Sequence, residues 1–443
     1  MFEATHITSN ADYEYFIRAT EPSAMAVILK SGLKKIWGDG FNLKNLRIPR
    51  VSTTKDNGMM IQYELSVENI PFGSAETIFL CGKLLEHGKR FDDYVGKLKG
   101  DTIIVKDIGL AIPIFPYDRK MPALMEIENI VNSPQIVEKI SAKLKVVGPV
   151  SSSVLYNVLG YRLEKRAVFR IDYEIVDKSG KKFNSSLIAK MFKPSSSNRA
   201  YNAFKVLEEN GFQSNSQDNI NIPEIVYFDE KNGILMTEYF DGITLRTLPK
   251  PDIYSRICGV AGTALNKLHN LSISDLPPFS SHNELETLET QISLLSKMFP
   301  SVIDDFKNAV ELLKERREFD DDNIRRVCSH RDFYDKQFLF SADRSVIIDC
   351  DNLAMADPAL DYGNFAAHLE LRKTQYPGNE DLFDNGREEF EKTYGNFDNT
   401  DFKQRAIWYE AATLTRLSML YLLRPSWRDI SPYILQKAFS LLN

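Results

Sequence analysis

Two short stretches decide the fold of this chain: His330-Arg331-Asp332-Phe333-Tyr334-Asp335-Lys336-Gln337 and Ser345-Val346-Ile347-Ile348-Asp349-Cys350-Asp351. The first places an aspartate, Asp332, within a polar segment. The second places another, Asp349, directly after an apolar run of the kind that forms a strand. A positioned carboxylate can orient a hydroxyl group and accept its proton, and a second can hold a magnesium ion. The spacing therefore predicts two cooperating acids at one site.

Residues 330–337 resemble the kinase catalytic-loop pattern H-R-D-x-x-x-x-N, with Gln337 at the position where Asn is usual. Asp332 then becomes the candidate catalytic base. Asp349 is a candidate magnesium ligand, and Gln337 a second one through its amide oxygen. Asp351 is a possible further ligand, although an exposed acid after a strand explains it equally well. Phosphoryl transfer requires such a pair of acids, so we expect a phosphotransferase that uses ATP and Mg²⁺.

The composition is that of a soluble globular protein with ample core. The 443 residues are 43% hydrophobic and 26% charged, and the net charge is −6. This charge gives no overall attraction to nucleic acid or to acidic membranes, so neither is expected as a partner. The four cysteines form no C-x-x-C pair, which argues against a zinc site or a disulfide framework. The start of the chain has no signal-peptide pattern and no apolar run approaches ~20 residues. We therefore expect a cytoplasmic protein.

The pattern along the chain predicts three parts. Residues 1–147 combine a helical segment with several strand-like runs and are predicted to form an α+β cap domain. Residues 148–241 are predicted to form a second antiparallel sheet that binds the nucleotide. Residues 242–443 are mainly helical and carry the two acidic stretches, so they are predicted to hold the catalytic loop and the acceptor site. The predicted fold class is therefore α+β, with a sheet-rich lobe followed by a helical lobe.

Candidate nucleotide-binding residues lie in the second part. Lys190 follows the apolar run Leu187-Ile188-Ala189 and can reach the α- and β-phosphates, unless it is a solvated lysine at a strand end. Glu208 and Glu209 are the two candidates for the acidic partner of this lysine. The loop Gly160–Arg166 occupies the place of a glycine-rich phosphate loop but has one glycine. Arg166, with Arg162 and Lys165, can supply charge in its place, or the loop is simply a charged hairpin tip. The segment before Asp241 is a candidate adenine-binding linker through Met236, Glu238 and Tyr239.

A third motif, Asp357-Pro358-Ala359-Leu360-Asp361, follows the metal motif. Asp357 and Asp361 are expected to cap the next helix and stabilise the catalytic loop. Together the three motifs resemble the aminoglycoside phosphotransferase/choline kinase-like superfamily. That resemblance covers about residues 150–440 and implies a protein-kinase-like fold, Mg-ATP and a small-molecule hydroxyl acceptor. The layout of the first part is similar to the N-terminal cap of maltokinase-like members.

The acceptor stays open at this point. An antibiotic, a sugar or another metabolite fits the resemblance, and a cationic acceptor would suit acidic side chains in the helical part (Glu380, Asp381, Asp384, Glu388 and Glu389). A solvated helix face explains those acids equally well. One rival is a pseudokinase or binding module, in which Gln337 and the glycine-poor loop mark lost catalysis and the N-terminal domain binds a protein partner. The other is a kinase that acts on a peptide or protein hydroxyl.

Overall fold

The computed structural model forms two compact units. The first takes the described chain up to Asn198 together with Ile225–Tyr239 and Leu423–Ser426, and the remainder forms the second. The chain therefore passes between the units several times. The structure describes residues 11–54, 58–69, 77–146, 149–273, 275–395 and 399–443.

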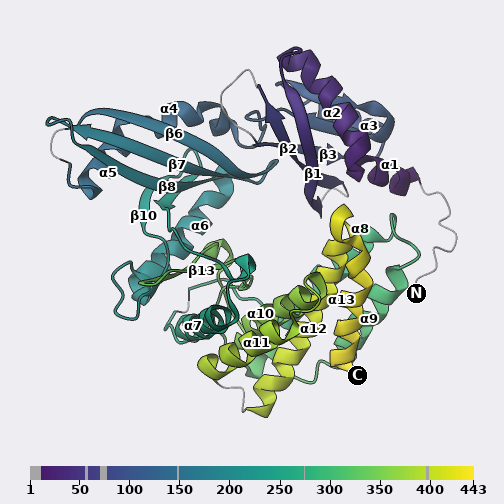
Figure 1. Ribbon diagram of the computed structural model, residues 1–443. Helices are drawn as coiled ribbons and strands as arrows, with labels where there is room; N and C mark the ends of the chain where they lie inside the picture. Colours follow the sequence, from purple (N-terminus) through teal and green to yellow (C-terminus); the bar gives the residue numbers. More distant parts are fainter. Residues whose placement is uncertain (1–10, 55–57, 70–76, 147–148, 274, 396–398) are drawn as a thin grey trace. The chain divides into compact units, whose positions relative to one another are not determined.

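The first unit begins with a five-stranded antiparallel sheet in the order β1-β2-β3-β5-β4. Side chains along β2 alternate between buried and half-buried, as in a strand with one face on a core. Helix α2 packs against β1 (Figure 1). The elements are α1 (Ala11–Thr20), α2 (Pro22–Trp37), β1 (Asn42–Thr53), β2 (Met59–Glu68), β3 (Thr77–Leu84), α3 (Lys89–Val95), β4 (Thr102–Val105) and β5 (Leu110–Pro113).

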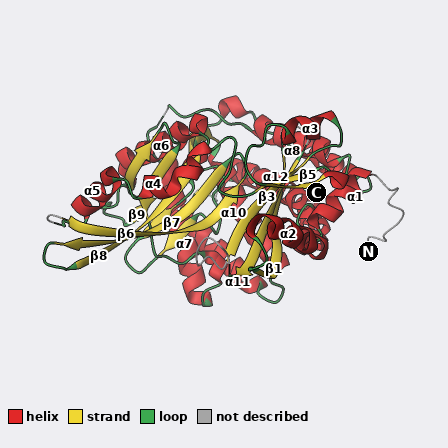
Figure 2. Cartoon of the chain, turned by 90° about the horizontal axis from the view of Figure 1, so that it is seen from above, coloured by secondary structure: helices red, strands yellow, loops and turns green. Residues whose placement is uncertain are grey.

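The second sheet of this unit is also antiparallel, in the order β10-β11-β8-β7-β6. Its three long strands β6, β7 and β8 run side by side in Figure 2. Two helices precede it in the chain, and α5 packs against β10. The elements are α4 (Ile127–Val131), α5 (Pro134–Lys143), β6 (Pro149–Arg162), β7 (Arg166–Asp177), β8 (Lys182–Phe192), β10 (Ile225–Asp229) and β11 (Ile234–Glu238).

One apolar core joins the two sheets. It contains Cys81 from β3, Val131 from α4, Ile140 from α5, and Phe169 and Met236 from the second sheet, all of them buried. Burial of apolar surface is the main stabilising term in folding. The two sheets therefore depend on the same core.

The second unit is mainly helical. Helix α7 packs on α11, α10 on α12, and α12 on α13 (Figure 1). Its elements are α6 (Pro194–Leu207, which starts in the first unit), β9 (Ile220–Asn221), α7 (Pro251–His269), α8 (Ser281–Leu295), α9 (Ile303–Glu315), β12 (Val327–Ser329), β13 (Phe338–Phe340), β14 (Ser345–Ile347), β15 (Ala354–Ala356), α10 (Pro358–Gln375), α11 (Glu380–Tyr394), α12 (Thr400–Leu422) and α13 (Ser431–Leu442).

Two glycines allow these helices to approach closely. A Cβ atom at Gly262 in α7 would lie 2.5 Å from the Phe390 carbonyl oxygen of α11. A Cβ at Gly363 in α10 would lie 2.6 Å from the Glu410 backbone nitrogen of α12. Real side chains do not approach backbone this closely, so these two crossings require glycine.

The α+β class predicted from the sequence is confirmed, with antiparallel sheets first and mainly helices afterwards. Strand β8, however, runs two residues past Lys190 to Phe192, so this lysine lies inside the strand and not at its end. Strand β14 is the apolar run predicted before Asp349, whereas strand β1 and the short strands β12, β13 and β15 were not predicted. The division at residues 147 and 241 stays a prediction.

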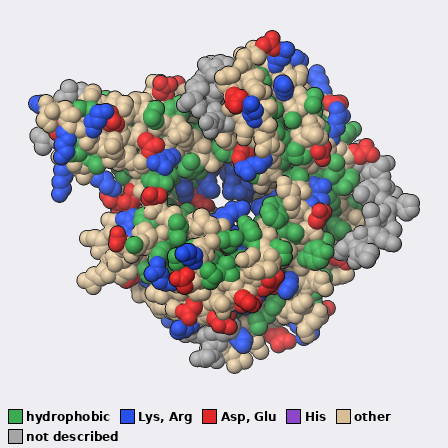
Figure 3. Space-filling view, viewed as in Figure 1, with side chains coloured by type: hydrophobic (Ala, Val, Ile, Leu, Met, Phe, Trp, Pro, Cys, Tyr) green, Lys and Arg blue, Asp and Glu red, His purple; other side chains and the backbone are tan. Residues whose placement is uncertain are grey.

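Basic and acidic side chains are interspersed over the face shown in Figure 3, in keeping with a net charge of only −6. Over the described residues, no helix combines the length and the apolar character needed to cross a membrane.

Candidate active site

A short hairpin in the second unit brings the two acidic stretches together. Strand β12 leads into residues 330–337, and β13 then pairs antiparallel with β14, with Phe338 opposite Ile347. The Ile348 N–H continues this ladder by donating to the Gln337 carbonyl oxygen at 2.9 Å. Residues on either side of the hairpin are thereby neighbours, so Gln337 and Asp349 must lie close together.

Gln337 links the two predicted acids. Its Nε2 lies 3.5 Å from Oδ2 of Asp332 and 3.5 Å from Oδ2 of Asp349. Gln337 is buried, and both aspartates are half-buried. A half-turn of the amide exchanges its NH₂ and its oxygen, so the same side chain can present oxygen to a cation between the acids. The structure thus brings together Asp332, Gln337 and Asp349.

Burial raises the pKa of Asp332, and the nearby charge of Asp349 acts in the same direction. Arg416, His330 and the Gln337 amide oppose the rise in the pKa. A nearby cation stabilises the ionised form of a carboxylate whose burial would otherwise disfavour ionisation. The charge balance therefore suits a site that receives a metal ion.

Two residues of the site, one of them an acid, have left-handed backbone conformations. Arg331 has φ of +67° and Asp349 has φ of +62°. Such conformations are uncommon outside glycine, and they cluster at functional sites where the surroundings impose them. Asp351 lies in the turn Cys350–Asn352 that follows and is half-buried.

Asp361, at the start of α10, holds the beginning of the catalytic loop. Its carboxylate accepts the backbone N–H of His330 at 2.7 Å and of Arg331 at 2.6 Å, and the hydroxyl of Ser329 at 2.8 Å. His269 Nε2 lies 3.1 Å away. Burial works to raise the pKa of Asp361, but these hydrogen bonds and the histidine charges outweigh it, and the pKa is lowered. The predicted role in stabilising the loop is confirmed for Asp361.

One face of α10 continues this contact along the loop. The residues involved recur every three or four positions, which is the spacing of a single helix face. Asp361 accepts the backbone N–H groups of His330 and Arg331 at the start of the loop. Further along, Asn364 Nδ2 donates to the Phe333 carbonyl at 2.9 Å, and the His368 ring stacks on Tyr334 with centroids 4.1 Å apart. Arg372 then pairs with Asp335. We call these four residues, Asp361, Asn364, His368 and Arg372, the α10 ladder.

The last rung of the α10 ladder is a buried bidentate ion pair. Arg372 donates through Nε to Asp335 Oδ2 at 2.7 Å and through Nη2 to Oδ1 at 2.9 Å. The two side chains are 2% and 1% exposed. Burial works to lower the pKa of Arg372, but the charge and hydrogen bonds of Asp335 outweigh it, and the pKa is raised. Bidentate pairs of this kind fix geometry as well as charge.

His330 itself has a supporting role. Its Nε2 lies 2.9 Å from the Ile348 carbonyl oxygen. This contact connects the catalytic loop to the residue that precedes Asp349, so the two acidic segments are held to each other as well as to α10.

Arg416 of α12 is a site residue that the sequence did not reveal. Its Nη2 donates to Asn364 Oδ1 at 2.9 Å and its Nε to Glu284 at 3.2 Å, and its charge acts on Asp332. Arg331 lies over the ring of Phe279 at 3.8 Å. Of these two guanidinium groups, that of Arg416 acts on the predicted base.

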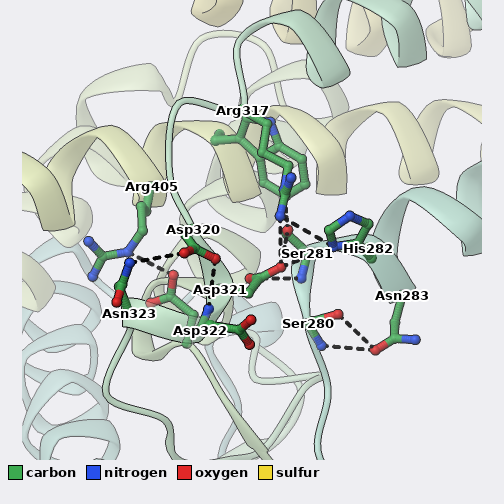
Figure 4. A network of polar contacts seen from close by, with 12 residues as sticks. Ser280, Ser281, His282, Asn283, Arg317, Asp320, Asp321, Asp322, Asn323 and Arg405 are labelled. Carbon is green, nitrogen blue, oxygen red and sulfur yellow. Dashed lines mark hydrogen bonds and ion pairs between the residues drawn. The ribbon is translucent and has the colours of Figure 1, made fainter.

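The segments that enter the site are anchored by further polar contacts. Asp321, in the turn before β12, accepts the Ser281 hydroxyl at 2.7 Å and Arg317 Nη2 at 3.1 Å (Figure 4). Asp357 caps α10 by accepting the Ala359 N–H at 3.0 Å, which confirms its predicted role. Arg405 of α12 forms an ion pair with Asp357, with Nε 2.8 Å from Oδ2.

The predicted nucleotide-binding residues belong to the first unit. Lys190 is half-buried in the middle of β8, where its backbone pairs with Val168 and Leu235. Arg166 opens β7. Met236 is buried in β11, and Glu238 ends that strand. Tyr239 N–H donates to the Ser186 carbonyl at 3.0 Å, and Arg170 lies 4.3 Å over its ring. Of the acids considered for Lys190, Glu208 is paired with Lys205.

No group of three or more His, Cys, Asp or Glu side chains within the described ranges forms a metal-binding cluster. The predicted site instead offers two carboxylates and one amide. This donor set fits magnesium, which binds hard oxygen ligands, takes only one or two protein carboxylates and completes its shell with phosphate oxygens and water.

A search of curated protein sequences finds no match. Among solved structures, the chain is similar to a choline/ethanolamine kinase family protein from Mesorhizobium loti, with 17% identity over 70% of this chain and 95% of that chain and a TM-score of 0.45. It is also similar to choline kinase LicA from Streptococcus pneumoniae, with 18% identity over 72% and 99% and a TM-score of 0.44. The aminoglycoside phosphotransferase APH(2'')-Ib gives 16% identity over 70% and 97% and a TM-score of 0.42.

A sequence model of the family described as "Phosphotransferase enzyme family" matches residues 172–401. The matched range includes Lys190, Asp332 and Asp349, and it ends before Arg416. The predicted superfamily and the predicted enzyme class, a phosphotransferase, are confirmed, whereas the similarity of the first part to maltokinase-like caps stays a prediction. Because the match spans more than half of the chain, this protein belongs to the phosphotransferase enzyme family.

Proposed function

We propose that this phosphotransferase moves the γ-phosphoryl group of ATP, with Mg²⁺, to a hydroxyl group of a small molecule. The observation that carries the proposal is the approach of Asp332 and Asp349 to the same amide, that of Gln337. Phosphoryl transfer depends on positioning and on charge neutralisation more than on covalent chemistry. A base and a metal-binding acid held a few ångströms apart provide both.

Each residue of the site has a distinct task in this proposal. Asp332 orients the acceptor hydroxyl and takes its proton as the oxygen attacks. Asp349 and the Gln337 amide oxygen hold the magnesium ion, with Asp351 as a further ligand. Bound magnesium neutralises the phosphate oxygens. The α10 ladder keeps the loop that carries Asp332 in place.

The nucleotide is assigned to the second sheet of the first unit. Lys190 and Arg166 supply positive charge to the phosphates. The backbone around Met236, Glu238 and Tyr239 supplies donors and acceptors to the adenine. Four buried cysteines that form no disulfide are consistent with the reducing, ATP-containing cytoplasm as the site of action.

The charges near Asp332 favour a neutral or anionic acceptor over an aminoglycoside. The positive charge of Arg416 acts on the base. The acids of α11 that suggested a cationic acceptor lie largely on its exposed side, where Asp384 pairs with Lys373 and Glu389 with Lys392. They behave as a solvated helix face.

The direct test is to incubate the enzyme with ATP, Mg²⁺ and a panel of neutral sugars, sugar acids, amino alcohols, aminoglycosides and hydroxyl-containing peptides. Mass spectrometry then detects the gain of one phosphoryl group. We expect phosphorylation of a small molecule. A gain confined to peptides would identify a peptide kinase instead, and Mg·ATP binding without any transfer would identify a binding module.

Asp349→Asn should weaken Mg²⁺-dependent nucleotide binding by more than about tenfold, because a metal ligand loses its charge. Asparagine tolerates the left-handed backbone of this position, so the local fold should survive. Titration calorimetry with and without Mg²⁺ measures the effect. The matched control is Asp343→Asn, in the exposed turn between β13 and β14. An unchanged magnesium dependence in Asp349→Asn would remove this residue from the metal site.

A further inference from the structure

The side chain of Arg331, next to the predicted base in the chain, is stacked on an aromatic ring. Its Cζ lies 3.8 Å from the centroid of the Phe279 ring, and the residue is half-buried. The Nε atom is shielded from solvent, and within the described part of the chain no acceptor forms a hydrogen bond with it. A buried N–H group without an acceptor is costly, so its presence calls for an explanation.

The ring beneath this guanidinium is held by backbone pairing. Phe279 N–H donates to the Met355 carbonyl at 2.9 Å, and Met355 N–H donates to the Pro277 carbonyl at 2.9 Å. Met355 lies in β15, opposite Cys328 of β12, the strand that leads into the catalytic loop. The Phe279 ring is therefore fixed beside that loop. A guanidinium that lies with its face on a ring directs its N–H groups sideways, within its own plane.

The backbone of Arg331 is fixed as well. Its φ is +67°, and its N–H donates to Asp361 Oδ1 at 2.6 Å. A left-handed conformation of a residue other than glycine persists where the surroundings impose it, and such residues cluster at functional sites. Because both the backbone and the face of the guanidinium are held, the edge that carries Nε is presented in one direction.

Two more arginines act on Arg331. Arg416 of α12 is held in place, since its Nη2 donates to Asn364 Oδ1 at 2.9 Å and its Nε to Glu284 Oε1 at 3.2 Å. Arg199 of α6 is exposed to solvent. Both arginines act electrostatically on Arg331, and all three belong to the second unit. We call Arg199, Arg331 and Arg416 the arginine cluster.

The charges around Arg331 are not balanced by the acids that act on it. Burial, then the charge of Arg199, and also that of Arg416 lower its pKa, whereas Glu284 and Asp361 oppose the change without reversing it. Both acids already accept hydrogen bonds from other groups, Glu284 from Arg416 and Asp361 from the catalytic loop. A guanidinium keeps its charge at any ordinary pH, so the lowered pKa marks a place where a further anion is stabilising.

We propose that the acceptor carries an anionic group besides its hydroxyl group, a carboxylate or a phosphate ester, and that the arginine cluster binds it. The inference rests on the proposed function, since it takes Asp332 as the base. The edge of Arg331 formed by Nε and one Nη presents two parallel N–H groups, which match two oxygens of a carboxylate or a phosphate. The oxygens would supply the acceptor that Nε lacks.

The arginine cluster is close enough to the base to orient such an acceptor. Arg331 precedes Asp332 directly, and the charge of Arg416 acts on Asp332. An acceptor held by its anionic group has fewer orientations open to its hydroxyl group. The hydroxyl oxygen then bonds to the γ-phosphorus as the bond to the β,γ-bridging oxygen breaks, the proton passes to Asp332, and ADP leaves.

Matched sets of acceptors give the first test. Glycerol, glycerate and glycerol 3-phosphate differ in the anionic group, and so do glucose, gluconate and glucose 6-phosphate. We expect kcat/KM to be at least about tenfold higher for anionic members, because a charged hydrogen bond is gained. The acid and phosphate arms show which anion is preferred. Equal values for the neutral members would overturn the inference.

The second test compares arginine variants. Arg331→Met should raise KM for an anionic acceptor by at least about tenfold and leave Mg·ATP affinity unchanged. Arg199→Met should act in the same direction, and its exposed position in α6 puts the fold at little risk. The matched control is Arg256→Met, since Arg256 of α7 is exposed and lies 5.1 Å over the ring of Phe340. Circular dichroism checks that all three variants are folded.

A binding measurement needs no turnover. Enzyme saturated with Mg²⁺ and a non-hydrolysable ATP analogue is titrated with sulfate and with acetate in a calorimeter. At least one of the two should bind wild type and the Arg256→Met variant, and it should bind Arg331→Met at least about tenfold more weakly. If Arg331→Met and Arg199→Met match the control in KM and in anion binding, the inference is overturned while phosphorylation by wild type still supports the proposed function. If wild type phosphorylates no compound, the proposed function fails as well.

Discussion

Asp332→Asn should lower kcat by about a thousandfold and leave the affinity for Mg·ATP near that of wild type. Asparagine keeps the shape of the side chain but cannot accept the proton of the acceptor hydroxyl. Asp332 lies beside Gln337, and the charge of Asp349 acts on it. The substitution removes the proposed base and leaves the proposed metal ligands, Gln337 and Asp349, in place.

Steady-state kinetics with the acceptor found by the panel measures kcat, and calorimetry measures Mg·ATP affinity. Asp343→Asn again serves as the control, because it makes the same chemical change in an exposed turn nearby. A kcat equal to that of the control would show that another group accepts the proton. A large loss of nucleotide affinity would instead place Asp332 among the metal ligands.

Arg372→Met should lower the free energy of unfolding by about 3–5 kcal/mol, because it leaves the Asp335 carboxylate buried without its partner. The two side chains are 2% and 1% exposed and share two hydrogen bonds. Turnover should fall as well, because Asp335 lies three residues after Asp332 in the loop that the α10 ladder holds.

Denaturant unfolding followed by fluorescence gives the stability. The control is Lys392→Met, which removes an exposed pair with Glu389 and should cost less than about 1 kcal/mol. The double variant Asp335→Leu with Arg372→Met should recover part of the loss, since it removes both buried charges. Equal stability of Arg372→Met and Lys392→Met would show that the pair contributes nothing to folding.

The core of the site follows from the sequence because its parts are close in the chain. Gln337 and Asp349 flank two short strands with a tight turn, and an antiparallel hairpin must bring such flanking residues together. The cap at Asp357 is equally local, since an aspartate before Pro358 marks a helix start. Local patterns of this kind can be predicted without knowledge of the rest of the fold.

The α10 ladder and Arg416 could not be predicted in the same way. Asn364, His368 and Arg372 recur at a helical spacing, which was a visible signal, but a polar stripe normally indicates a solvent-facing side. Only the loop that covers this stripe explains why it is buried. Arg416 lies more than eighty residues beyond Asp332 in the chain, and its approach depends on the packing of α12 against α10.

The first unit shows the same limit. The sequence identified Arg162, Lys165 and Arg166 as charges in a glycine-poor loop. It gave no sign of Asp118, whose carboxylate accepts the Glu164 N–H, because this approach depends on the core that the two sheets share. Strand β1 was missed because charged residues and Pro49 interrupt its alternation of apolar side chains.

The α10 ladder also bears on how such an enzyme can be regulated. Side chains of one helix, α10, form hydrogen bonds with loop residues on both sides of Asp332. The loop therefore cannot move at Asp332 alone. Loop and helix have to travel as a single rigid body. A ligand or modification that displaces Asp332 must therefore tilt or unfold a whole helix, a far larger rearrangement than the opening of a surface loop.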